Sequence, residues 1–180
     1  MEEIEDPTES LHEHIHEGAH HAAAEGNKWI VYVALTTAII AVFSAITSLL
    51  AAYHADESML SQIHASDQWA YYQAKGIKSE MLVTSNKILV AMGRAPIAED
   101  VEKVKENKAE QAKIMTEAKD FQKESDGHTA KHSTLAKSVT LFQVAIAIGA
   151  ISIITKRRAL WLGSMGFAII GVVFFVMGLM

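Results

Sequence analysis

The segment WIVYVALTTAIIAVFSAITSLLAAY, residues 29–53, is 25 residues long and contains no charged side chain. A bilayer core about 30 Å thick is crossed by roughly 20 apolar residues in a helix, so this segment predicts a transmembrane helix. It follows an acidic leader of 28 residues and is too long for the apolar region of a signal peptide. We therefore expect a retained anchor.

Two further uncharged apolar runs lie near the C-terminal end of the sequence. They cover residues 139–155, which are just long enough to span, and residues 159–180. A chain of 180 residues with three such runs has little room for a soluble domain with a large core of its own. The pattern predicts an all-α, multi-pass membrane protein with three transmembrane helices.

The middle segment, residues 54–137, carries most of the charged residues and is expected to form a helical hairpin. Its only proline, Pro96, lies in Gly93-Arg94-Ala95-Pro96, a combination that ends one helix and starts another. The two arms are nearly equal in length, which predicts a long extramembrane antiparallel hairpin with Ile77 and Met115 as neighbours. No helix breaker separates either arm from the adjoining span, so we expect both helices to continue across that boundary.

Composition narrows the range of functions. Residues 1–28 hold eight acidic side chains against one lysine, whereas residues 54–137 are nearly balanced in charge, which argues against a nucleic-acid partner. The absence of cysteine excludes disulfides, thiolate catalysis and cysteine-ligated metal centres. Catalysis needs titratable groups that converge in a pocket. The sequence contains no catalytic motif, so we expect no enzymatic activity.

The orientation in the membrane follows from the basic residues near the spans. Lys156-Arg157-Arg158 is the whole connection between the last two runs, and a short basic loop normally stays cytoplasmic. This places the leader inside and the hairpin outside. Four lysines near the start of the second span argue for the reverse: Lys119, Lys123, Lys131 and Lys137. We favour the short loop, because segments longer than about 60 residues translocate with little regard to charge.

Small residues suggest how the helices associate. One stripe in the first span recurs at steps of four and three, formed by Ala34, Ala38, Ala41, Ala45, Ser48 and Ala52. The last span carries Gly163, Gly166, Gly171 and Gly178, which predict close contact either with a neighbouring copy or within the chain. These faces offer more packing surface than one monomer uses, so we expect a homo-oligomer held mainly through the first and last spans. Gln143 is expected to make one interhelical hydrogen bond rather than line a pore.

The leader, residues 1–28, contains the sharpest candidate for metal chemistry. In a helix, His12, His16 and His20 stand at four-residue steps on one face, and such imidazole pairs can chelate zinc or another divalent metal. The alternative is a solvated acidic helix without metal. No other cofactor is expected.

A second candidate site lies in residues 66–78, SDQWAYYQAKGIK. Asp67, Trp69, Tyr71 and Tyr72 predict a partner-binding surface, because tryptophan and tyrosine are the usual anchors of protein interfaces. The alternative is that the aromatic residues pack the two arms together, with Asp67 hydrogen-bonded to the other arm.

The same residues carry a resemblance to a known family. ALTTA at 34–38, HADE at 54–57 and ASDQWAYYQAKGIK at 65–78 resemble the bacterial membrane family listed as domain of unknown function 4337. The resemblance extends over essentially the whole chain. It implies a bacterial inner-membrane protein with no assigned activity, and therefore no catalytic residue to carry over.

Two classes of function follow. The first is a non-enzymatic membrane scaffold or accessory protein that self-associates and presents its hairpin to a partner, such as another membrane protein complex, with membrane lipid around its spans. The second is an oligomeric transport or metal-handling protein that uses the His-rich leader. A conducting pathway needs polar groups at membrane depth. Only Gln143 and a few threonines and serines are available, so a pore would have to be formed by oligomerisation.

Overall fold

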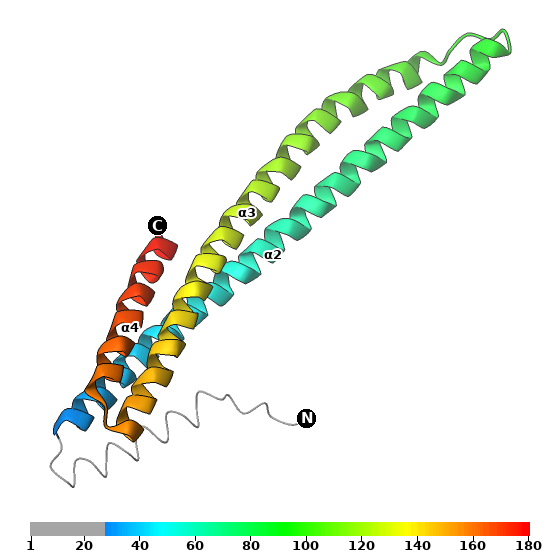
Figure 1. Ribbon diagram of the computed structural model, residues 1–180. Coiled ribbons are helices and arrows are strands. Elements are labelled where there is room, and N and C mark those ends of the chain that lie inside the picture. The colour runs from blue at the N-terminus through cyan, green and yellow to red at the C-terminus, as the bar shows by residue number, and fades with distance from the viewer. Residues whose placement is uncertain (1–27) are drawn as a thin grey trace, which may run out of the picture. The chain divides into compact units, whose positions relative to one another are not determined.

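The computed structural model describes residues 28–180, which form helices and no strand. Helix α2 covers Lys28–Ala91, α3 covers Ala98–Thr155 and α4 covers Arg158–Leu179, with 64, 58 and 22 residues (Figure 1). All three helices are long and apolar enough to cross a membrane. The described residues divide into two units, which we call the bundle unit (28–54 and 130–180) and the helical pair (55–129).

Residues 92–97 connect α2 to α3, and the predicted helix break at Gly93–Pro96 falls within this link. Gly93 has φ 73°, a left-handed conformation that glycine adopts without steric cost. The backbone N–H of Arg94 donates to the carbonyl of Leu89 at 2.9 Å, which closes the last turn of α2. Asn86 accepts a hydrogen bond from the N–H of Ile97 at 2.8 Å and so fixes the entry into α3.

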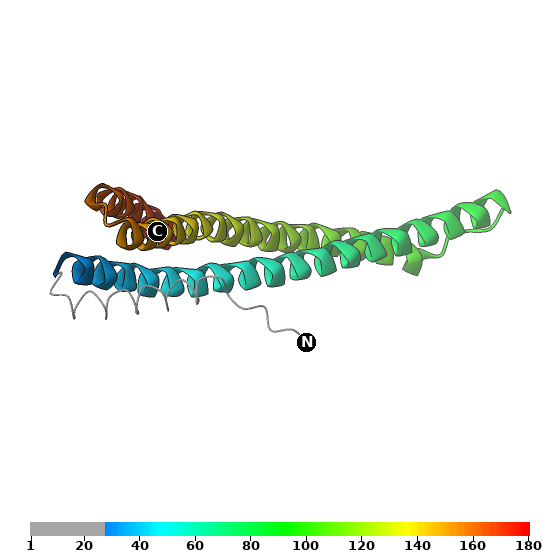
Figure 2. The same cartoon turned by 60° about the horizontal axis from the view of Figure 1, so that its bottom comes forward.

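In the helical pair, α2 and α3 run side by side (Figure 2), and their contacts pair residues in opposite order along the chain. The Ser125 hydroxyl donates to the carbonyl of Ser58 at 2.9 Å, and the Gln111 amide donates to that of Tyr72 at 3.0 Å. The register differs from the predicted one. Because Tyr72 lies against Gln111, Met115 lies level with residues that precede Tyr72, and Ile77 is 62% exposed.

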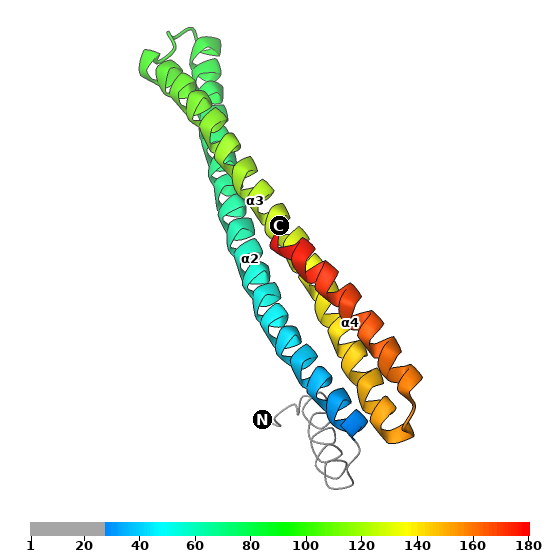
Figure 3. The same cartoon turned by 90° about the vertical axis from the view of Figure 1, so that its left-hand side faces the viewer.

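The bundle unit has a small apolar core to which all three helices contribute. The buried members are Ile40 of α2, Phe142, Ala145, Ile146 and Ala150 of α3, and Ala168 of α4. The two helices α3 and α4 lie side by side (Figure 3) and are tied by the Ser164 hydroxyl, which donates to the carbonyl of Ala145 at 2.7 Å. The Trp161 indole of α4 donates to the Thr36 hydroxyl of α2 at 3.2 Å.

The buried face of α2 in the bundle unit is not the predicted small-residue stripe. It lies one residue earlier in phase and consists of Ile30, Val33, Thr37, Ile40, Ser44, Thr47 and Ala51. Within the stripe, Ala34 and Ala41 pack partly against the core, whereas Ala45, Ser48 and Ala52 are exposed. Thr37 and Thr47 donate to the carbonyls of Val33 and Phe43 in their own helix. Their hydroxyls are thereby satisfied, and they can be buried as small side chains.

The glycines of α4 divide between two surroundings. A Cβ on Gly171 would lie 2.8 Å from the ring of Phe142, and one on Gly178 would lie 2.6 Å from Leu135, so both glycines allow α4 to approach α3 closely. A Cβ on Gly163 or Gly166 would meet no atom within 4 Å. Gly171 and Gly178 therefore serve contact within the chain, whereas Gly163 and Gly166 remain available to a neighbour.

Candidate functional site

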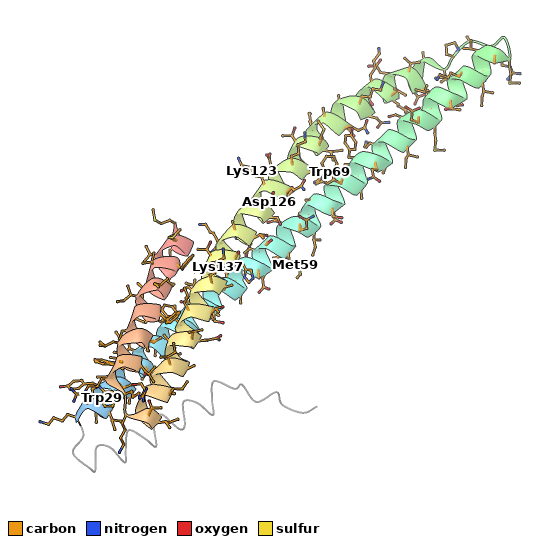
Figure 4. All side chains as sticks on the ribbon, viewed as in Figure 1. Trp29, Met59, Trp69, Lys123, Asp126 and Lys137 are labelled. Carbon is orange, nitrogen blue, oxygen red and sulfur yellow. The ribbon has the colours of Figure 1, made fainter. Side chains whose placement is uncertain are left out.

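The aromatic segment 66–78 lies in the helical pair, where its residues have different surroundings. Trp69 and Tyr72 are half-buried and pack edge to face, with ring centroids 5.6 Å apart (Figure 4 labels Trp69). The carbonyl of Tyr72 accepts the Gln111 amide, and a Cβ on Gly76 would lie 2.9 Å from the same amide nitrogen. Tyr72 and Gly76 therefore belong to the contact between α2 and α3, as the packing alternative for the aromatic residues predicts.

Lys75 provides an ion pair between α2 and α3. Its ammonium group pairs with Glu110, lies 3.4 Å from the amide oxygen of Asn107 and sits 5.6 Å from the centroid of the Tyr71 ring. The hydrogen bond to Glu110 raises the pKa of Lys75 above 10.5, against a smaller opposing effect of desolvation. Lys75 thus stays charged and holds the two helices in register, a role not predicted from the sequence.

Asp67 and Tyr71 are the members of the predicted partner-binding set that remain accessible. Tyr71 is 50% exposed, although Lys75 covers one face of its ring. Asp67 is exposed, and its carboxylate makes no hydrogen bond or ion pair with any described residue. It is therefore not bonded to the other arm. Asp67 and Tyr71 therefore place a carboxylate and a phenol at the surface of the helical pair.

Exposed apolar side chains also follow α2 in the helical pair. Met59, Ile63, Ile77, Met81 and Ile88 are 65%, 50%, 62%, 68% and 55% exposed. A shallow groove of about 750 Å³ lies on this side of α2 and includes Gly76, Ile77 and Met81 in its lining. Figure 4 places Met59 on the side of α2 away from α3.

A second groove, of about 430 Å³, lies between α2 and α3 near the link 92–97. Its apolar lining comes from Val83, Val90, Pro96, Val101 and Val104, and its charged lining from Lys87, Lys105 and Lys108. This groove was not predicted from the sequence. The available signal was the group of valines interspersed with lysines on both sides of Pro96.

The remaining predicted site residues carry no site chemistry in the described chain. His12, His16 and His20 lie outside residues 28–180. Within that range, no three His, Cys, Asp or Glu side chains come close enough together to hold a metal ion. Gln143 lies on the exposed surface of α3 and makes no side-chain hydrogen bond to any described residue, so the described helices of this chain do not supply its expected interhelical partner.

These observations define, for residues 28–180, an all-helical fold whose helices are long and apolar enough to cross a membrane. The family described as Domain of unknown function (DUF4337) matches residues 29–180, and the chain belongs to it. No curated protein and no solved structure matches the chain. The family assignment agrees with the resemblance carried by ALTTA, HADE and the aromatic segment.

Proposed function

We propose that this protein is a non-enzymatic scaffold or accessory protein of a bacterial inner membrane, which self-associates and presents an extramembrane helical hairpin to a partner. The observation that carries the proposal is the distribution of charge and exposure along α2 and α3. In the bundle unit, large apolar side chains such as Leu49 and Ile154 are 73% and 78% exposed, which suits contact with lipid. No charged residue occurs between Trp29 and Ala55 or between Ser138 and Thr155.

The helical pair has the properties of a segment in water. Charged residues begin at Asp56 on α2 and continue to Lys137 on α3. The surface of α3 carries two ion pairs, Glu99 with Lys103 and Glu102 with Lys105. The two partners of each pair lie about one helical turn apart, as is usual on solvated helices. The accessible Asp67 and Tyr71 supply the surface that a partner would contact.

The absence of cysteine from the sequence allows a direct topology test of the full chain. Single-cysteine variants are labelled in intact cells with a membrane-impermeant maleimide, before and after permeabilisation. We expect Lys123→Cys in the helical pair to react when the outer membrane has been permeabilised and the inner membrane is still intact. Lys156→Cys, in the basic turn, should react only after the inner membrane is permeabilised.

Leu49→Cys provides the control for the membrane interior, because it is highly exposed in the bundle unit and should nevertheless react poorly in both conditions. Release of the parent protein by an alkaline carbonate wash would refute the membrane proposal. Labelling of Lys123→Cys and Lys156→Cys on the same side would refute the proposed topology.

The partner contact is tested separately. Photo-crosslinking from a reactive residue placed at Tyr71 should give a discrete adduct. The same probe at Ala109, an exposed position on α3, serves as the control. Loss of the adduct on Asp67→Ala would support the contact, and equal adducts at both positions would contradict it.

A further inference from the structure

In the helical pair, the outside of α2 carries large apolar side chains. At about 100° per residue, Met59, Ile63, Ile77, Met81 and Ile88 fall within a sector of about 40° on α2. The positions between them lie inside this sector or within about 20° of its edges and are also uncharged: Ser66, Ala70, Ala74 and Thr84. All nine residues are exposed, and together they form what we call the outer apolar face.

On the α2 side of the seam with α3, the fully buried side chains are small or polar, and Leu82, Val83 and Leu89 are half-buried. The buried residues that α2 contributes to the helical pair are Ser61, Ala65, Ser79 and Asn86. An isolated pair of helices in water gains most by burying its larger apolar side chains and exposing its polar ones. Here the isoleucines and methionines of α2 are outside. A continuous exposed apolar face of this kind indicates a surface that another molecule covers.

We propose that a second copy of this chain covers the outer apolar face, with α2 packed against α2 in parallel about a two-fold axis. This inference rests on the proposed function, because copies inserted into a membrane with the same topology have parallel α2 helices. Each copy then places the same residues against the other, so that Ile77 and Met81 lie near the axis. The groove beside Gly76 receives apolar side chains of the second copy.

Two charged residues beside the outer apolar face favour a second copy in parallel orientation as its occupant. Lys78 and Glu80 lie about 80° to either side of its centre line, two residues apart along the helix. Neither makes an ion pair with any described residue. In a parallel two-fold pair, opposite flanks face each other, so Glu80 of each copy meets Lys78 of the other. An antiparallel pair would instead bring like flanks together.

Small residues in the bundle unit are consistent with the same occupant. There, α2 independently leaves Ala45, Ser48 and Ala52 exposed, and such residues allow close approach of a helix within lipid. A soluble partner would reach only the helical pair, and lipid would reach only the bundle unit. A second copy has a helix that passes from uncharged to charged residues at the same position.

Disulfide crosslinking of the full chain in native membranes tests the proposal. Ile77→Cys and Met81→Cys should each give a product of twice the monomer mass on mild oxidation. Ala109→Cys, which is exposed on α3, is the matched control and should give at least several-fold less. Equal crosslinking at Ala109, or an adduct at Ile77 with a different protein, would overturn the proposal.

Charge reversal distinguishes the parallel two-fold arrangement from chance collisions. In the Ile77→Cys background, Lys78→Glu or Glu80→Lys alone should lower the dimer yield, because each places like charges opposite one another. The double variant should restore the yield, and failure of that rescue would refute the arrangement. Absence of crosslinks in carbonate-washed membranes that retain the protein would overturn this inference alone. Loss of the protein from those membranes would overturn the proposed function.

Discussion

The close contact between Gly171 of α4 and Phe142 of α3 provides a test of the bundle packing. A Cβ on Gly171 would lie 2.8 Å from both Cδ1 and Cε1 of Phe142, well inside van der Waals contact. Phe142 is 1% exposed and packs beside Phe43, with ring centroids 6.4 Å apart, so its ring has little space to move. The Ser138 hydroxyl also donates to the carbonyl of Gly171 at 2.8 Å, which holds the α4 backbone close to α3.

Gly171→Ala should therefore destabilise the bundle. Extra methyl groups forced into a well-packed core cost typically about 1–3 kcal/mol. Alanine has a higher helix propensity than glycine by about 1 kcal/mol. This gain in helix propensity should contribute little to the measured stability if sodium dodecyl sulfate separates the helices without melting them, because alanine is then helical in both states. Gly166→Ala is the matched control on the same helix, because its Cβ would meet no atom within 4 Å.

The assay is titration of the full chain in mild detergent with sodium dodecyl sulfate, followed by tryptophan fluorescence. Trp29 and Trp69 are replaced by phenylalanine in every variant, so that the signal comes from Trp161, which contacts α2. We expect Gly171→Ala to lower the free energy of helix separation by about 1–3 kcal/mol relative to Gly166→Ala. Equal stability of the two variants would refute the close approach of α4 and α3 at Gly171.

Three further predictions concern the turns and helix ends. Lys156 has φ 52°, a left-handed conformation that costs a non-glycine residue of order 1–3 kcal/mol. Lys156→Gly should therefore stabilise the bundle by up to about that amount in the same titration. If the variant gains no stability, the backbone at Lys156 is not strained. The hydrogen bond from Lys103 lowers the pKa of Glu99 below 4.5, so this pair stabilises the start of α3 above pH 4.5 and ceases to do so as the pH falls through the lowered value. Lys103→Met should return the pKa of Glu99 towards 4.5 in an NMR titration, and an unchanged value would refute the pairing. Asn86→Ala removes the bond to the Ile97 N–H and should speed amide exchange at the start of α3 about tenfold, whereas the exposed control Thr84→Ala should not.

The helix boundaries were predictable because they depend on features that are local in sequence. Runs without charge identified the three helices that are long and apolar enough to cross a membrane. The glycine and proline of residues 93–96 located the link between α2 and α3, where Gly93 adopts its left-handed φ. Continuity of α2 past residue 54 was predictable from the absence of helix breakers, and the helix indeed extends to Ala91.

The faces of the helices were harder to predict, because the seams are built from small and polar residues. In α3, Val101 is 43% exposed, whereas the buried positions include Asn107 as well as Ile114 and Ala118. Hydrophobicity does not distinguish Ser61 or Ser79 at the seam from Ser66 on the outer apolar face. Only the contacts with the neighbouring helix make that distinction.

The candidate site was predictable in composition but not in arrangement. The aromatic residues of 66–78 suggested an interface, and the structure separates them into the half-buried Trp69 and Tyr72 and the exposed Tyr71. The roles of Lys75 and Gln111 depend on the register between α2 and α3. A shift of that register by a few residues would give both side chains different neighbours. Spacing within one helix carries no information about that register.

A seam of small polar side chains has a consequence for how the helical pair is held together. Ser58 and Ser125 exchange hydroxyl contacts across the seam, and the Ser58 and Thr129 hydroxyls lie 2.7 Å apart. Such bonds contribute only about 1 kcal/mol each in net stability, but they are directional and fix which residues face each other. The isoleucines and methionines that α2 contributes to the helical pair lie on the outer apolar face and add no burial to this seam. The hydroxyl contacts therefore fix the register of the helical pair, and contact along the outer apolar face would add apolar burial to it.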